Sequence, residues 1–415
     1  MMPDTRYLTR NAASDAPRFD PRSITTSTFE RYRVLAAGVF SLVLTLGVAR
    51  FAYTPLLPLM QQQAGLGIAA AGWLASINYI GYLSGALVIS LISDLALKDR
   101  LYRAGLVLAV LTTLMMGLST NMTIWAISRY LAGLSSAAGM LLGSGLILNW
   151  LIRHNQRSEL GIHFGGVGLG IAASAGAVMA MNRWSLDWRQ QWDVFTVSGA
   201  VLILPALRWL PPPVAGAAPA AGQSMLDAPP SPTFLRVLMA FYFCAGVGYV
   251  VSATFIVAIV DHLSHLPGHG TLAFLVIGIA ATPSCAIWDL IARRSGNLNA
   301  LILASMLQIA GILLPLFIDG LAPTLFGAML FGASVMGIVS LVLTMAGRYY
   351  PTRPAKMMGT MTLAYGLAQV IAPALTGSVA THLGGYQSGL YFAATLMVGG
   401  TLLLFIAGWI TRPSS

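Results

Sequence analysis

Apolar stretches of about twenty residues recur along the whole chain, and their length is the feature that most limits its fold. A helix of about twenty residues crosses the roughly 30 Å hydrocarbon core of a membrane. In that core only helices and closed barrels satisfy every backbone N–H and C=O group. We therefore predict an all-α integral membrane protein with twelve transmembrane helices, near residues 34–60, 70–93, 101–119, 123–148, 158–181, 190–209, 235–260, 272–292, 298–318, 322–347, 356–380 and 387–410.

Composition excludes several other classes of protein. Hydrophobic residues make up 57% of the 415 residues and charged residues 9%, whereas a soluble domain averages about 25% charged residues. The net charge of +10 comes from scattered cations without a basic run, so nucleic-acid binding is not indicated. The two cysteines, Cys244 and Cys285, lie in apolar stretches and are expected to stay free thiols.

The basic residues predict the orientation of the chain. Of the 23 Lys and Arg, only Arg183 and Arg189 lie in odd-numbered connections, and only Arg50 and Arg129 lie inside apolar stretches. Loops on the cytoplasmic side of a membrane carry an excess of Lys and Arg. We therefore predict a multi-pass protein of the cell inner (plasma) membrane with both termini in the cytoplasm.

Two six-helix bundles are predicted, at residues 33–209 and 234–412. Residues 210–233 between them are rich in Pro, Gly and Ala, which is typical of a cytoplasmic linker. Residues 1–32 are polar and lack the apolar core of a signal peptide, so we expect a disordered cytoplasmic tail.

The two halves echo one another. Asp94 ends the second apolar stretch and basic residues follow it, and Asp289, near the end of the eighth, is followed by Arg293 and Arg294. Such repetition is typical of secondary transporters built from two halves. The segment after Asp94 resembles the loop motif between helices two and three of the major facilitator superfamily, although Ser90 stands where the family has glycine.

Further segments resemble the same superfamily, and more narrowly its YbfB/YjiJ branch. They are Arg129-Tyr-Leu-Ala-Gly133, Gly47-Val-Ala-Arg-Phe-Ala-Tyr-Thr-Pro-Leu-Leu-Pro58, His163-Phe-Gly-Gly-Val-Gly-Leu-Gly170, Gly246-Val-Gly-Tyr249 with Ala253-Thr-Phe255, and Gly366-Leu-Ala-Gln369. The resemblance implies a transporter fold over residues 33–410 without naming a substrate. It also implies that the helices of Tyr53, Tyr249 and Gln369 line a central cavity, and that Arg129 takes part in coupling or gating.

Arg50 is the first candidate for a binding residue. It lies about 17 residues into the first apolar stretch, roughly 25 Å from the cytoplasmic end. A mid-membrane Arg costs at least about 2.5 to 3.5 kcal/mol to insert, and all 13 acids lie in tails, loops or helix ends. Its planar donors match the two oxygens of a carboxylate. The alternative is an Arg50 satisfied by helix carbonyls, Asn78 or a Tyr hydroxyl.

Polar and aromatic residues at helical spacing complete the candidate substrate site. Tyr53 is three residues from Arg50, which predicts a shared face. The other members are Asn78 with Tyr82, Tyr249, and Tyr365 with Gln369. Each could stack on or hydrogen-bond to a ligand, or could instead hold membrane helices together. For Gln308 we favour that packing role, since the resembled fold places the ninth helix at the periphery.

A second group is predicted to act in coupling or gating. Arg129 lies about six residues from the outer end of its stretch, so it could reach the interface or brace neighbouring helices instead. His163 could titrate or simply pack. Asp94 and Asp289 are predicted to be paired cytoplasmic latches, or else solvated acids.

No metal, cofactor or catalytic cluster is predicted. Asp261, His262, His265 and His269 share an outer loop, but Pro267 and Gly268 break any common helical face, and zinc needs ligands in fixed geometry. The spans lack a nucleophile with a base, or clustered His and acid, so an enzyme is disfavoured. Direct use of ATP is disfavoured as well, because no Gly-x4-Gly-Lys-Ser/Thr loop occurs.

The predicted function is therefore secondary active transport of a small solute, an organic anion, by alternating access around a central site near Arg50. Two alternatives stay open: an exporter of hydrophobic or drug-like compounds, and a membrane sensor or scaffold of the same fold that does not transport. The expected partners are the small-molecule substrate, the lipid bilayer and, where transport is coupled, a proton. A monomer is expected.

Overall fold

The computed structural model describes residues 21–154, 156, 160–213, 229–263, 266–350, 354–383 and 385–410. These residues form α-helices and two π-helical segments. In chain order they are α1 (Pro21–Leu42), η1 (Val43–Phe51), α2 (Tyr53–Ala64), α3 (Ile68–Leu91), α4 (Leu95–Leu118), α5 (Met122–Ala137), η2 (Ala138–Leu142), α6 (Gly143–Arg153), α7 (Gly161–Arg183), α8 (Trp188–Trp209), α9 (Pro232–Asp261), α10 (Gly270–Ala281), α11 (Ser284–Ser295), α12 (Asn297–Phe317), α13 (Leu321–Tyr349), α14 (Pro354–Leu383) and α15 (Gln387–Ile410).

The predicted all-helical membrane fold is confirmed. Within the described residues, eleven helices are long and apolar enough to cross a membrane, and the bent pair α10 and α11 would make a twelfth. The predicted eighth helix is thus broken, with a bend of 48° between its two parts. Pro283 lies at the break, and proline both lacks the N–H that an unbroken helix needs and clashes with the preceding turn.

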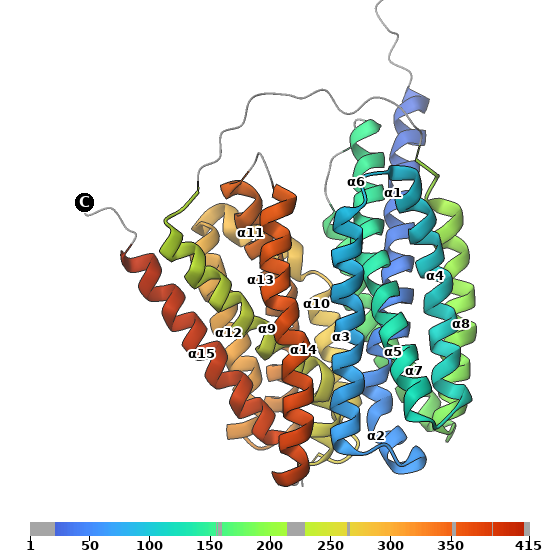
Figure 1. Ribbon diagram of the computed structural model, residues 1–415, viewed down its shortest axis with the longest axis vertical. Helices are drawn as coiled ribbons and strands as arrows, with labels where there is room; N and C mark the ends of the chain where they lie inside the picture. The colour runs from blue at the N-terminus through green and yellow to red at the C-terminus, as the bar shows by residue number, and fades with distance from the viewer. Residues whose placement is uncertain are drawn as a thin grey trace, which may run out of the picture.

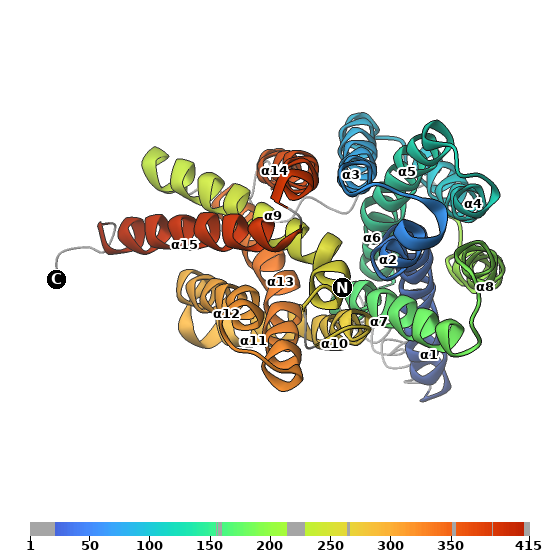
Figure 2. The ribbon, with the colours of Figure 1, turned by 90° about the horizontal axis from the view of Figure 1, so that it is seen from below.

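The helices form two groups that lie side by side (Figures 1 and 2). Helices α1 to α8 pack on one side and α9 to α15 on the other, and the groups meet where α3 contacts α14, α7 contacts α10, and α2 contacts α9. The bounds of the two predicted bundles stay a prediction. One difference is that α1 begins at Pro21, inside the segment expected to be a tail; proline is well tolerated in the first turn of a helix.

Contacts between the two groups gather at the end of the molecule opposite the start of α1. The Thr54 hydroxyl donates to the Ala253 carbonyl at 2.9 Å. Gln61 Nε2 donates to the Tyr386 hydroxyl at 3.0 Å. Burial raises the pKa of Tyr386 to about 12, so this hydroxyl stays neutral and can hold the contact. In the predicted orientation this is the outer end, and these two hydrogen bonds join the groups there.

Glycines allow two of the helices to touch across the groups. A Cβ on Gly168 of α7 would collide with the backbone of Thr282, and a Cβ on Gly278 of α10 would collide with the backbone of Ala172. Small residues let membrane helices approach this closely. The contact between α7 and α10 therefore depends on these two positions lacking side chains.

Candidate substrate site

A widened helical turn carries Arg50. In η1 the N–H of Ala52 donates to the Gly47 carbonyl, five residues back, at 2.9 Å. Pro55 follows within one turn and has no N–H to donate, which helps to break the regular helical ladder. Single π-helical turns are rare and are frequent at functional sites. The local sequence therefore gives the Arg50 backbone an unusual geometry at the middle of the molecule.

The Arg50 side chain is surrounded by aromatic rings. It is 6% exposed, and its guanidinium carbon lies 4.2 Å from the centroid of the Tyr79 ring and 5.0 Å from that of Tyr82. The Phe51 ring centroid is 5.5 Å away. Among the described residues, Arg50 Nε is buried without a hydrogen-bond partner. Cation–π contacts of this kind stabilise a desolvated charge by about 2 kcal/mol.

The second group of helices closes this aromatic shell. Tyr249 of α9 lies near the Arg50 guanidinium. The Tyr249 and Tyr365 rings stack with centroids 5.9 Å apart, and the Tyr365 and Tyr242 rings stack at 4.5 Å. We call Tyr79, Tyr82, Tyr242, Tyr249 and Tyr365 the tyrosine shell. It joins both halves of the molecule around one buried cation.

Arg129 lies beside Arg50 but has different neighbours. Its Nη1 donates to the Ala49 carbonyl at 3.1 Å and to the Arg50 carbonyl at 3.3 Å. Its guanidinium carbon lies 4.6 Å from the Tyr53 ring centroid. The side chain is 3% exposed, so it does not reach the interface. Arg129 therefore braces the π-helical segment from α5.

Tyr53, expected on the face of Arg50, and Asn78, an alternative partner of Arg50, both contact Arg129. The spacing placed Tyr53 beside Arg50, but its ring covers Arg129 and its hydroxyl donates to the Ala71 carbonyl at 3.0 Å. The wider π turn rotates the residues that follow it relative to Arg50. Asn78 Nδ2 donates to the Arg129 carbonyl at 2.8 Å, so it joins α3 to α5. Both arginines, Tyr53 and Asn78 still line one cavity of about 10 Å³, near the minimum for one water.

Sequence reasoning missed two members of the tyrosine shell. Tyr79 precedes Tyr82 by three residues, and Tyr242 precedes Tyr249 by seven, so each pair shares a helical face. That spacing was a usable signal. Tyr82 was paired with Asn78, four residues before it, and the equally suitable Tyr79, three residues before it, was left out.

Two glutamines in the second group are buried in different ways. Gln369 lies one turn beyond Tyr365 on α14 and is 5% exposed. Gln308 on α12 is 1% exposed, and within the described chain neither its Nε2 nor its Oε1 has a hydrogen-bond partner. Its Nε2 lies next to Gly248, so the side chain packs between helices without joining them by a hydrogen bond to a described residue.

The predicted gating residues lie in separate places. His163 is fully buried, with Nε2 at 3.0 Å from Ser144 Oγ. Asp94 caps α4, where it accepts from the N–H groups of Ala96 and Leu97 at 3.1 and 3.2 Å. Asp289 lies within α11 and pairs with Arg293 at 2.6 Å, with half of its side chain exposed. The structure does not bring these three residues together.

The outer loop has no metal-binding geometry in the part that is described. No group of three His, Cys, Asp or Glu side chains comes together within the described residues. Asp261 Oδ1 instead accepts from the Gly270 N–H at 2.8 Å, which ties the end of α9 to the start of α10. His265 lies outside the described residues.

Known proteins share this sequence pattern and fold. A family model described as "Uncharacterised MFS-type transporter YbfB" matches residues 42–405. The chain is 25% identical over 387 residues to the inner membrane transport protein YdhP of Escherichia coli K12, covering 90% of this chain and 94% of that protein. It is 24% identical over 379 residues to the MFS-type transporter YceJ of Bacillus subtilis, covering 88% and 92%.

Solved structures support the fold. Two crystal structures of the nucleoside transporter NupG, one of a mutant, superpose with TM-scores of 0.72 and 0.67 at 14% identity. They cover 91% and 92% of this chain and 100% of their own.

Proposed function

The chain belongs to the YbfB family of MFS-type transporters, and from that premise we propose that it moves a small organic anion across the membrane by alternating access, with Arg50 as the anion contact. Membership of the family makes it a multi-pass membrane transporter. The substrate, the site and the mechanism are our proposal.

The environment of Arg50 carries this proposal. The neighbours described around its guanidinium are the rings of Phe51, Tyr79 and Tyr82. A cation–π shell offsets only part of the insertion cost of a mid-membrane Arg. A ligand carboxylate would supply the missing negative charge and would accept a bidentate pair of hydrogen bonds. Arg129 differs, because backbone carbonyls already accept from it.

The tyrosine shell supports a substrate with a planar part. Tyr79 and Tyr82 come from α3, whereas Tyr249 comes from α9 and Tyr365 from α14. A ring held between these side chains would contact both halves at once. Because a ligand can shift a conformational equilibrium only by its different affinity for the two states, contact with both halves would let binding favour movement.

His163 is our candidate for coupling to a proton. His163 lies on α7 and shares a hydrogen bond with Ser144, and histidine is the side chain that titrates most readily near neutral pH. We keep His163 as the proposed coupling residue. A pH gradient that drives uptake by the native protein but not by a His163→Gln variant would support this role.

A ligand screen followed by transport assays tests the function. Purified protein is heated with aromatic carboxylates, aliphatic carboxylates, neutral aromatic compounds and amines, since only ligands that bind the folded state stabilise it. The compounds that stabilise are then offered to proteoliposomes. We expect aromatic carboxylates to stabilise and to be taken up. Stabilisation by amines alone would contradict an anion-binding site. Binding without uptake would favour the alternative of a membrane sensor that does not transport.

A further inference from the structure

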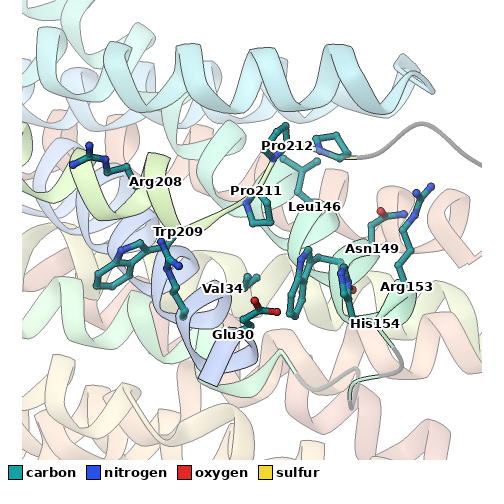
Figure 3. Close-up of a pocket in the computed structure, with 13 residues that line it drawn as sticks. Glu30, Val34, Leu146, Asn149, Arg153, His154, Arg208, Trp209, Pro211 and Pro212 are labelled. Atoms are coloured by element: carbon teal, nitrogen blue, oxygen red, sulfur yellow. The ribbon is translucent and has the colours of Figure 1, made fainter. Parts of the chain in front are cut away.

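A second cavity opens far from the tyrosine shell, between the ends of α1, α6 and α8. It has a volume of about 360 Å³. Figure 3 shows Glu30 and Val34 of α1 on one wall and the first linker residues, Pro211 and Pro212, on the facing wall. In the predicted orientation this is the cytoplasmic surface of the membrane.

Charges of both signs line this cavity. Arg33, Arg153 and Arg208 each come from a different helix, and Arg153 and Arg208 lie at opposite ends of the cavity in Figure 3, with Glu30 between them. Within the part of the chain that the structure describes, Arg33, Arg208 and Glu30 form no ion pair. Arg33 and Arg208 together with Glu30 therefore offer partners to a ligand that carries both charges.

Arg103 hydrogen-bonds two carbonyls at the end of α8. The carbonyls of Leu207 and Leu210 accept from the Arg103 guanidinium, each at 3.2 Å. Asp99 Oδ2 holds Arg103 Nε at 2.9 Å. The C-terminal end of α8 carries about half a negative elementary charge from the helix dipole. Arg208 carries a full positive charge, so the two together leave a net positive charge at this end. Arg208 is exposed and forms no ion pair with another described residue, so it can contact an anion.

An apolar stripe leads along α8 to Arg208. Val197, Val201 and Leu204 are 66%, 61% and 56% exposed. Their spacing places them on one face of the helix, and Arg208 continues that face one turn later. Exposed apolar side chains on a membrane helix meet acyl chains, and Trp residues such as Trp150 and Trp209 favour the headgroup level. A lipid on this face would bring its headgroup to the cavity.

We propose that this cavity binds the headgroup of a phosphatidylethanolamine lipid from the cytoplasmic leaflet. Arg33 and Arg208 hold the phosphate, Glu30 accepts from the ammonium, and an acyl chain lies along Val197, Val201 and Leu204. A lipid with only a negative headgroup leaves Glu30 without a positive partner. A choline headgroup has the charge but no N–H to donate to Glu30.

Lipid titration of the purified full-length protein, read by native mass spectrometry, tests this site. Phosphatidylethanolamine and phosphatidylglycerol with the same acyl chains are compared. We expect tighter binding of phosphatidylethanolamine to the native protein. Arg33→Gln and Arg208→Gln should each weaken it about tenfold, as expected for one charged hydrogen bond. The matched control is Arg236→Gln, an exposed arginine at the start of α9, which should bind lipid as the native protein does.

Glu30→Gln gives the sharpest result. This substitution should weaken the binding of phosphatidylethanolamine and strengthen the binding of phosphatidylglycerol, so that the order of the two affinities reverses. Equal binding of both lipids to the native protein, or an unchanged order in Glu30→Gln, would overturn the proposal. Soluble phosphoethanolamine that binds as tightly as the lipid would assign the cavity to a free phosphate compound instead. All three substituted side chains are exposed, so the variants are expected to fold.

Discussion

The two halves of this transporter share a helical architecture but divide the buried charge unequally. Among the described residues, the buried Arg, Lys, Asp, Glu and His side chains are Arg50, Asp99, Arg129 and His163, and all four lie in the first half. The second half contributes Tyr249 and Tyr365 to the centre. Under the proposed function, the first half recognises the charge of the ligand, while the second half contacts its neutral part.

Removing Arg50 should have the largest effect on charge recognition by the first half. Arg50→Ala is expected to abolish binding of the carboxylate found by thermal screening. Arg50→Lys keeps the charge but loses the planar pair of donors, so affinity should fall at least about tenfold. Isothermal titration of each variant measures the effect, with Arg236→Ala as the control. Normal affinity in a folded Arg50→Ala protein would make Arg50 a structural residue and end the organic-anion proposal.

Arg129 tests whether the second buried arginine of the first half is structural. Arg129→Gln leaves the Ala49 and Arg50 carbonyls without these hydrogen bonds, which should lower the free energy of unfolding by about 1 to 3 kcal/mol. Thermal melting of the purified variant in detergent measures this loss of stability. Affinity should fall less than in Arg50→Lys. A larger loss of affinity than in Arg50→Ala, at unchanged stability, would exchange the roles that we give to the two arginines.

Tyr365→Leu sharpens the comparison from the side of the second half. An aromatic pair contributes about 0.5 to 1.5 kcal/mol beyond its buried area, so affinity for aromatic carboxylates should fall about two- to tenfold. Affinity for aliphatic carboxylates should stay unchanged. Competition binding with both ligand types on one preparation gives the ratio directly. An equal loss for both would show that Tyr365 shapes the site without stacking on the ligand.

The smallest difference is expected between Asp94 and Asp289. Asp94→Ala removes a helix cap, which usually costs about 0.5 to 2 kcal/mol. Asp289→Ala removes a half-exposed pair with Arg293, which contributes only about 0.3 to 0.5 kcal/mol. Melting curves and initial transport rates of the two variants test this order. Equal and large losses of turnover in both, at unchanged stability, would restore the symmetric latches that the sequence echo predicted.

The sequence was most informative where a single charged residue lies inside an apolar stretch. Arg50 could be singled out because a charge so deep in an apolar stretch needs a neighbour, and the structure buries it as expected. Neighbours were harder to predict. Tyr53 was placed on the face of Arg50 from regular helical spacing, and Asn78 was named as an alternative partner of Arg50. In the structure the Tyr53 ring covers Arg129 and Asn78 donates to the Arg129 carbonyl.

The apolar stretches by themselves determined that this chain forms a helical membrane protein, because their length and the demands of the backbone in lipid leave no other solution. Spacing along one helix also indicated which residues share a face. Only the tertiary structure decided which faces meet. Helical spacing has the same period for a ligand-binding face and for a packing face, so the tyrosine shell becomes visible only when α3, α9 and α14 come together around Arg50.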